Sequence, residues 1–169
     1  MTTLLNYAAL RNHSIFTEPV FVQGFSSVGD GGEGIFFWDT NNSDADNGGT
    51  ILQSTFTSPP PTGRWQRLLD DVIMESWFGA LGDGIADASI AVQNAINSAV
   101  KTGLTLVFLR GVYRFDQIIN IGVPENTSLT IQGNGAVIKS SNLTTQIWSE
   151  VNLIRFYSSS GVDTLKTRC

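Results

Sequence analysis

Residues 104–139 read LTLVFLRGVYRFDQIINIGVPENTSLTIQGNGAVIK and decide the fold class. They contain short apolar segments separated by Gly, Asn and Pro turns, at 104–109, 111–115, 117–121, 128–132 and 135–139. The first segment is almost wholly apolar, which is typical of a strand buried on both faces. A further strand is expected at 151–157. Because no second helical pattern lies between these strands, the sequence argues against a doubly wound α/β sheet and favours a solenoid of stacked coils.

One helix is expected immediately before these strands. Apolar residues recur at helical spacing at positions 88, 92, 95, 96 and 99, and Gly103 ends the pattern. The carboxylate of Asp87 can accept hydrogen bonds from the first turn, so we expect Asp87 to be the N-cap. The sequence therefore predicts a helix over 88–101 that covers the N-terminal end of the coils, with 71–87 as a linker.

Residues 1–70 have the pattern of a small antiparallel sheet. Three short strands are predicted, at 19–23, 35–38 and 50–53. A glycine-rich turn at 29–34 and a polar loop at 39–49 separate them. Three prolines at 59–61 block regular structure after the third strand.

Composition narrows the classes of function. The chain has 169 residues, of which 41% are hydrophobic and 15% charged, a mix that suits β-structure with many turns. Its net charge of −5 and its lack of a basic cluster argue against a nucleic-acid partner. One histidine and one cysteine leave no multi-histidine or thiolate metal site, and no cofactor is expected. No apolar run is long enough for membrane insertion, and the N-terminus lacks the basic region of a signal peptide.

Several spaced motifs carry a resemblance to a known family. The segments 63–68, 77–80 and 82–87, the helix with Gln93, and the later Val107-Phe108-x-x-Gly111-x-Tyr113 and 129–138 occur in the order found in that family. Together they resemble the start of a pectate-lyase-superfamily right-handed β-helix. The upstream segments 30–34 and 46–50 are similar to the small β-module that precedes this start in phage tailspikes. The residues that carry the motif are Arg64, Trp65, Trp77, Phe78, Gly79, Asp83, Gly84 and Asp87. The chain departs from the family at Ala88 and Ser89, where a second Asp and a Thr are usual.

The resemblance implies a mainly β fold in three parts. These are a particle-proximal β-module at 1–70, the linker at 71–87, and a capping helix with a short parallel β-helix at 88–169. It also implies a homotrimer in the phage virion, made in the host cytoplasm. Other phage tail or baseplate proteins, and host surface polysaccharide, are the partners it suggests.

Three functions are consistent with this resemblance. The first is a virion structural protein, the base or adaptor of a tailspike, without catalysis of its own. The second is a short or truncated polysaccharide depolymerase, and the third is a glycan-binding module without catalysis. Family depolymerases carry their carboxylates on central coils, whereas 104–157 allows only two or three coils of about 20–25 residues. We therefore expect the first function, with no catalytic, cofactor-binding or metal-binding residue. The strand-like end of the coils also favours assembly with further chains.

Each candidate site has a structural interpretation that the sequence favours. Residues 29–34 match GxGxxG, but a strand follows where a dinucleotide site needs a helix, so a tight turn is expected. Asp39, Asp44 and Asp46 could hold a cation, but they lack the spacing of a calcium loop, and a solvated polar loop is favoured.

The carboxylate pair Asp83 and Asp87 could serve acid–base chemistry. A Gly-Asp-Gly turn and a helix start instead favour binding of backbone N–H groups. Asp116 and Glu125 look isolated in the sequence. An aromatic set could stack on sugars, but packing is favoured for it: Phe36, Phe37, Trp38, Trp65, Trp77 and Phe78.

Overall fold

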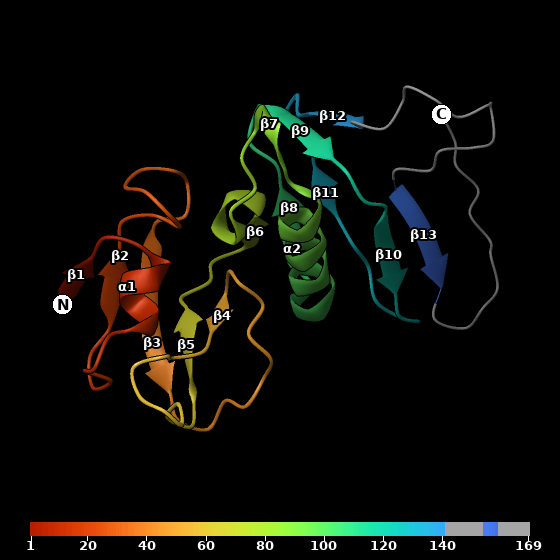
Figure 1. Cartoon of the computed structure of the whole chain (residues 1–169). Helices are drawn as coiled ribbons and strands as arrows, with labels where there is room; N and C mark the ends of the chain where they lie inside the picture. Colours follow the sequence, from red (N-terminus) through yellow and green to blue (C-terminus); the bar gives the residue numbers. More distant parts are fainter. Residues whose placement is uncertain (141–153, 159–169) are drawn as a thin grey trace, which may run out of the picture.

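The computed structural model describes residues 1–140 and 154–158 (Figure 1). The first part of the chain forms β1 (Thr2–Leu4), α1 (Tyr7–Arg11), β2 (Val20–Val22), β3 (Gly34–Asp39), β4 (Ile51–Leu52) and β5 (Arg64–Arg67). The second part forms β6 (Val72–Met74), the 3-10 helix η1 (Glu75–Phe78), β7 (Asp83–Asp87), α2 (Ser89–Thr102), β8 (Thr105–Val107), β9 (Val112–Phe115), β10 (Ile119–Val123), β11 (Ile131–Gln132), β12 (Val137–Ser140) and β13 (Ile154–Ser158). Within the described residues, no helix is both long and apolar enough to span a membrane.

The first part is a five-stranded sheet in the order β1-β2-β3-β5-β4. The three predicted strands are present as β2, β3 and β4, with slightly different ends. Three elements were not predicted: β1, which pairs parallel with β2, the short helix α1, and β5, which lies between β3 and β4. The sheet is therefore mixed rather than purely antiparallel. The alternation of its strands sends Val20, Val22, Phe36, Leu52 and Trp65 to one face, where α1 adds Tyr7 and Leu10 to the core.

The second part is a stack of parallel coils. Three sheets run along the stack, in the orders β6-β8-β11, β7-β9-β12 and β10-β13, and every pairing in them is parallel. Each coil gives one strand to each sheet, except that α2 stands in the first coil beside β10. The predicted fold, a small β-module followed by a helix and a short parallel β-helix, is confirmed.

The register shows how the coils stack. Ile73, Leu106 and Ile131 lie in register on consecutive coils, at intervals of 33 and 25 residues. The first interval is the longer one because it includes α2. Ile73 and Leu106 are fully buried and join Val92, Ile96 and Tyr113 in the core of the stack. The core therefore lies between the sheets and α2.

The stack begins earlier than the sequence suggested. Residues 71–87, expected as a linker, contain β6 and β7, which pair with β8 and β9. These strands are short, and Gly82-Asp-Gly84 reads locally as a turn, so only the long-range pairing reveals them. The stack therefore starts at Val72 rather than near Leu104. In β8 only Leu106 is buried, so burial of this strand on both faces was a wrong expectation.

The predicted helix is confirmed to within one residue at each end. It runs from Ser89 to Thr102, and Gly103 follows it in the left-handed conformation. The expected N-cap was wrong by one position, because Ala88 is the cap and Asp87 ends β7. The N–H of Ala88 donates to the carbonyl of Arg114, so strand pairing continues up to the helix. Of the strand expected at 151–157, residues 154–157 lie in β13, and 151–153 lie outside the described residues.

Candidate functional site at the junction of sheet and coils

The sheet module and the first coil meet around Arg67. Its guanidinium, in a residue only 5% exposed, donates to Tyr7 Oη at 2.5 Å, Gly32 O at 2.6 Å and Glu33 O at 2.8 Å. Burial lowers the pKa of Arg67, against the opposing effect of Tyr7. A buried cation is tolerated here because oxygen acceptors replace its water shell.

Aromatic rings of both the sheet module and the first coil contact the guanidinium of Arg67. Its central carbon lies 4.9 Å from the ring centroid of Phe36 in β3 and 4.3 Å from that of Trp77 in η1. Cation–π contacts of this kind are worth about 2 kcal/mol when they are desolvated. Arg67 therefore links the sheet module to the first coil.

Further contacts close this junction. Ser76 Oγ donates to Gly31 O at 2.8 Å, and the hydroxyls of Thr50 and Ser98 lie 3.2 Å apart in a buried contact. At the surface, Lys101 pairs with Asp44 at 2.6 Å. The loops of the sheet module thus contact both η1 and α2.

The glycine of the Trp77–Gly79 motif is required by this packing. Gly79 has φ +84° and ends η1 in the left-handed conformation. A Cβ at this position would lie 2.5 Å from Phe25 Cε1. Phe78 is buried in the same way against Gly49, where an added Cβ would meet its ring at 2.5 Å. The motif residues therefore sit where the two parts touch.

The turn at 29–34 is built around one carboxylate. Asp30 accepts from the N–H groups of Phe25, Ser26, Ser27 and Gly32 at 2.8–3.1 Å. Burial opposes its charged form, but these four hydrogen bonds prevail and lower the pKa of Asp30. The strand β3 follows the turn, as predicted, so no helix begins at this GxGxxG match.

The two carboxylates of the first coil also bind backbone N–H groups. Asp83 accepts from Ile85 and Ala86, and these bonds lower its pKa. Asp87 accepts from the N–H and Oγ of Ser89, which outweigh burial and lower its pKa as well. Both carboxyls therefore favour the ionised form, which suits a structural role better than that of a general acid.

The polar loop at 39–49 is ordered by its own carboxylates. Asp46 binds Arg11 through both oxygens and accepts from Gly48 and Gln53. Burial opposes this charge, but the bond from Arg11 leads the effects that lower the pKa of Asp46. Asp39 accepts from Asn41 and Gln66. The expectation of a solvated polar loop was wrong for Asp46, because the guanidinium of Arg11 binds its carboxylate. Among the described residues, no cluster of three His, Cys, Asp or Glu side chains could hold a metal.

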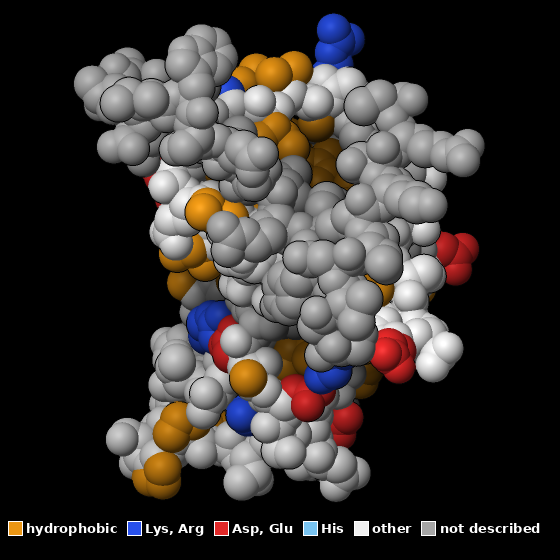
Figure 2. All heavy atoms as spheres, turned by 90° about the vertical axis from the view of Figure 1, so that its right-hand side faces the viewer, with side chains coloured by type: hydrophobic (Ala, Val, Ile, Leu, Met, Phe, Trp, Pro, Cys, Tyr) orange, Lys and Arg blue, Asp and Glu red, His pale blue; other side chains and the backbone are white. Residues whose placement is uncertain are grey.

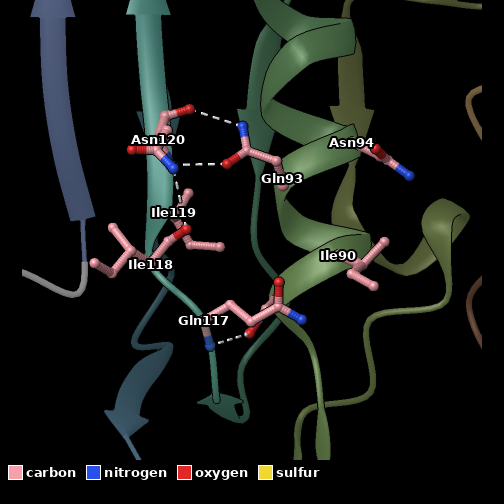
Figure 3. A pocket seen from close by; sticks show the side chains of 8 residues that line it. Ile90, Gln93, Asn94, Gln117, Ile118, Ile119 and Asn120 are labelled. Carbon is pink, nitrogen blue, oxygen red and sulfur yellow. Dashed lines mark hydrogen bonds between the residues drawn. The ribbon is translucent and has the colours of Figure 1, made fainter.

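A side-chain amide closes the edge of β10 (Figure 3). Gln93 of α2 donates from Nε2 to Asn120 O and accepts from Asn120 N, both at 2.7 Å. Two bonds to one residue reproduce what a neighbouring strand would supply. Between β9 and β10, Ser89 Oγ accepts from the N–H groups of Asp116 and Gln117. The first coil thus supplies a helix where its third strand would lie.

Asp116 and most of the aromatic candidates have structural partners. Asp116, which looked isolated, pairs with Arg114 at 2.7 Å, while Glu125 lies in the turn after β10. Trp65 and Phe36 are fully buried, and Trp38 packs on Trp65 at 5.3 Å between centroids.

Arg64 lies beside Asp39 and donates to the carbonyls of Asp44 and Gly63. Gly84 has φ +70°, and a Cβ there would lie 3.3 Å from Val112. The aromatic candidates are divided between the two cores and do not form one stacking platform, and Phe37 alone of the six lies in neither core, at 38% exposure.

The sequence did not reveal the roles of three residues at this site, Arg67, Glu75 and Gln93, although Arg67 and Gln93 belong to the segments that carry the resemblance. Glu75 is fully buried and accepts at Oε1 from Tyr113 Oη and Leu109 N, while Oε2 has no partner among the described residues. Burial, with Glu75 adding to it, raises the pKa of Tyr113. The burial of Arg67 could have been inferred from the sequence, since Arg67 alternates with Trp65 and so faces the core.

The face of the molecule shown in Figure 2 is mixed in charge. Acidic and basic side chains of described residues lie next to one another there, with hydrophobic side chains between them. No single sign of charge dominates the described part of this face.

Two family models match consecutive parts of the chain. The model described as "Phage tail protein small four-stranded beta-sheet domain" matches residues 3–70. The model described as "Rhamnogalacturonase A/epimerase, pectate lyase-like" matches residues 76–161. A protein of Klebsiella pneumoniae, "Uncharacterized 65.4 kDa protein in cps region", is 41% identical over 64 residues, which are 37% of this chain and 11% of that protein.

Solved structures share the fold. The tailspike of Acinetobacter baumannii phage AM24 superposes with a TM-score of 0.62 at 18% identity, over 91% of this chain and 31% of its own. The enzymatically active domain of bacteriophage CBA120 tailspike protein 4 gives 0.63 at 13% identity, over 94% and 20%. Pantoea stewartii WceF, a glycan biofilm modifying enzyme, gives 0.60 at 15% identity, over 84% and 22%. The chain thus spans less than a third of the length of these proteins.

Proposed function

We propose that this chain, which belongs to the pectate-lyase-like rhamnogalacturonase A/epimerase family and carries a phage-tail β-sheet domain before it, builds the base of a tailspike. In this proposal the sheet module faces the phage particle and the coils begin the spike. The chain is a virion structural protein, assembled in the host cytoplasm as a homotrimer. Its contacts are other tail or baseplate proteins, and host polysaccharide lies within reach of the spike.

The observation that carries the proposal is the junction around Arg67. A flexible tether between particle and spike would need no buried contacts. Here a buried cation, the pair Thr50–Ser98 and the packing of Phe78 on Gly49 hold the sheet module against the first coil. Such a rigid junction fixes the orientation of the coils relative to the sheet module. The base of a spike needs this fixed orientation.

The same proposal assigns no catalysis to the described residues. Asp83 and Asp87 bind backbone N–H groups, and both have lowered pKa values. A general acid at neutral pH needs the opposite shift. The carboxylates of this region are therefore proposed to shape the coils.

Depolymerisation is the second candidate, because WceF, which shares the fold, is a glycan biofilm modifying enzyme. The test is an assay of the purified chain on capsular polysaccharide and exopolysaccharide, beside a glycan-binding screen. We expect no release of reducing ends or unsaturated sugars. Release that is lost in Asp83→Asn or Asp116→Asn would establish the enzyme instead, and binding without release would establish a glycan-binding module.

The structural role has its own test. Antibody to the chain, applied to purified phage particles in electron microscopy, should label the base of the spikes at the tail. Particles that carry the spike but bind no antibody would refute the proposal.

A further inference from the structure

The sheet module has a second apolar face. Residues paired in register share a face, which places Thr3 with Phe21, Phe21 with Ile35, and both Phe37 and Ile51 with Gln66. We call this set the outer face: Thr3, Phe21, Ile35, Phe37, Ile51 and Gln66. It lies opposite the face that packs against α1.

The outer face belongs to neither core of the described residues. None of its apolar side chains packs against the cluster around α1 or against the cluster of the coils. Phe37 is 38% exposed, and Leu68, whose N–H continues the pairing to Ile35, is 57% exposed. A sheet with one face in water normally carries polar residues there. Apolar side chains gathered on such a face mark a contact surface.

The charges around this face favour a second copy of the chain as the occupant. The six residues of the outer face are uncharged, whereas the chain carries a net charge of −5. Two copies with the same net charge repel one another overall, so an uncharged patch favours a close contact between them. A strongly charged partner would instead select a patch of the opposite sign.

The rim of the outer face fits the same partner. Asp39 and Arg64 follow the face on neighbouring strands and lie directly opposite each other in register. One acidic and one basic residue side by side make a rim that is complementary to itself. In a symmetric assembly the acidic side of one copy can therefore meet the basic side of the next.

We propose that the outer face is a contact between copies of this chain, and that three such faces meet around the axis of the spike. This inference rests on the homotrimer of the proposed function. A standard interface buries about 800 Å² on each partner, and the sheet is only about 20 Å wide. The coils must supply the rest of the contact, and the outer face fixes how the sheet modules meet.

The test compares two exposed phenylalanines by sedimentation equilibrium. Phe37→Glu places a charge in the outer face, whereas Phe56→Glu changes a side chain that is 44% exposed and lies outside every strand. We expect the wild-type chain to be a trimer, Phe37→Glu to weaken its association at least about tenfold, and Phe56→Glu to change nothing. If Phe37→Glu does not fold, as circular dichroism would show, Phe37→Thr takes its place and must also weaken association.

The two proposals fail in different ways. A wild-type trimer that Phe37→Glu or Phe37→Thr leaves intact would overturn the outer-face contact and leave the homotrimer standing. A wild-type monomer would overturn both. A photoreactive phenylalanine analogue at position 37 should join two copies through the outer face. Cross-links confined to one copy would overturn the contact, with position 56 as the matched control.

Discussion

In residues 1–70, side chains hold long loops in place around a small sheet, whereas in residues 72–140 the backbone of each coil is held by the next coil. Asp30 alone accepts four N–H groups, and Asn47 Oδ1 accepts three, from Gly49, Thr50 and Ile51. The coils instead rely on parallel strand pairs and a stacked apolar core. The loops of the sheet module therefore depend on a few polar residues, whereas the stabilising contacts of the coils are spread along the stack.

The two regions join at Arg67, one of the polar residues on which the sheet module depends. Arg67 belongs to the sheet module, but its guanidinium lies on Trp77 of the coils. We therefore expect single substitutions to have their largest effects in the sheet module and at the junction, and smaller effects within the coils.

The largest expected effect is that of Arg67→Ala. It removes hydrogen bonds from a buried cation to Tyr7, Gly32 and Glu33, and leaves those acceptors unpaired. We expect the free energy of unfolding, measured in urea, to fall by about 3 kcal/mol or more. Arg64→Ala is the control on the same strand, because Arg64 is only half-buried, and it should cost less than about 1 kcal/mol. Equal losses in the two variants would contradict the role given to Arg67.

The next effect separates packing at the junction from backbone strain. Gly79→Ala and Gly103→Ala both place a Cβ on a residue with positive φ, at +84° and +74°. Only the Cβ at 79 meets a neighbour within 4 Å, Phe25, whereas nothing lies that close at 103. We expect losses of about 2 kcal/mol at 79 and about 1 kcal/mol at 103. Thermal unfolding of both variants measures the difference, and an equal loss would mean that Phe25 moves aside freely.

Much of the coil region could be predicted because its signals are local. The helical spacing of 88–99 and the stop at Gly103 predicted α2 to within one residue at each end. Each strand from 104 onward is a short apolar run between turns, and these strands were found in the correct order. β6 and β7 were missed because their sequences show no strand pattern. β6 has only three residues, which is too short for an alternation, and β7 begins within a Gly-Asp-Gly sequence that is typical of a turn. Their pairing with β8 and β9 alone makes them strands.

The site was harder to predict because its residues act through distant partners. Gln93 is half-buried in α2, where glutamine is common, and its role in binding the edge of β10 depends on Asn120, 27 residues away. Glu75 follows an apolar strand and gives no sign that it is fully buried. The carboxylates Asp83 and Asp87 were predicted to bind backbone N–H groups because turns and helix starts are local features, and the hydrogen bonds confirm this.

A further prediction uses pH to isolate a carboxylate of the sheet module. The pKa of Asp46 is lowered in the folded chain, so its stabilisation is present above the unfolded pKa of about 3.9. This stabilisation is lost as the pH falls through the folded pKa. Asp46→Asn should cost about 1.5 kcal/mol at pH 7, because it removes the charge that Arg11 binds. The difference from wild type, followed by urea unfolding, should shrink as the pH drops below about 4. The exposed Asp71→Asn is the control, and a pH-independent gap for Asp46→Asn would refute the assignment.

The smallest effect should arise in the coils, at the edge of β10. Gln93→Ala removes both hydrogen bonds to Asn120, but the edge borders an open pocket, so water can replace them. We expect a loss of about 1 kcal/mol in stability, together with faster hydrogen exchange of the Asn120 amide. Asn94→Ala is the matched control, since Asn94 is the next residue of α2 and its side chain points away from β10 (Figure 3). The substitution leaves the core of the coils intact. Hydrogen exchange of the amides in the sheet module should therefore not change. If the Asn120 amide exchanges at the wild-type rate in Gln93→Ala, the hydrogen bond that it donates to Gln93 does not protect it, and α2 covers β10 by packing alone.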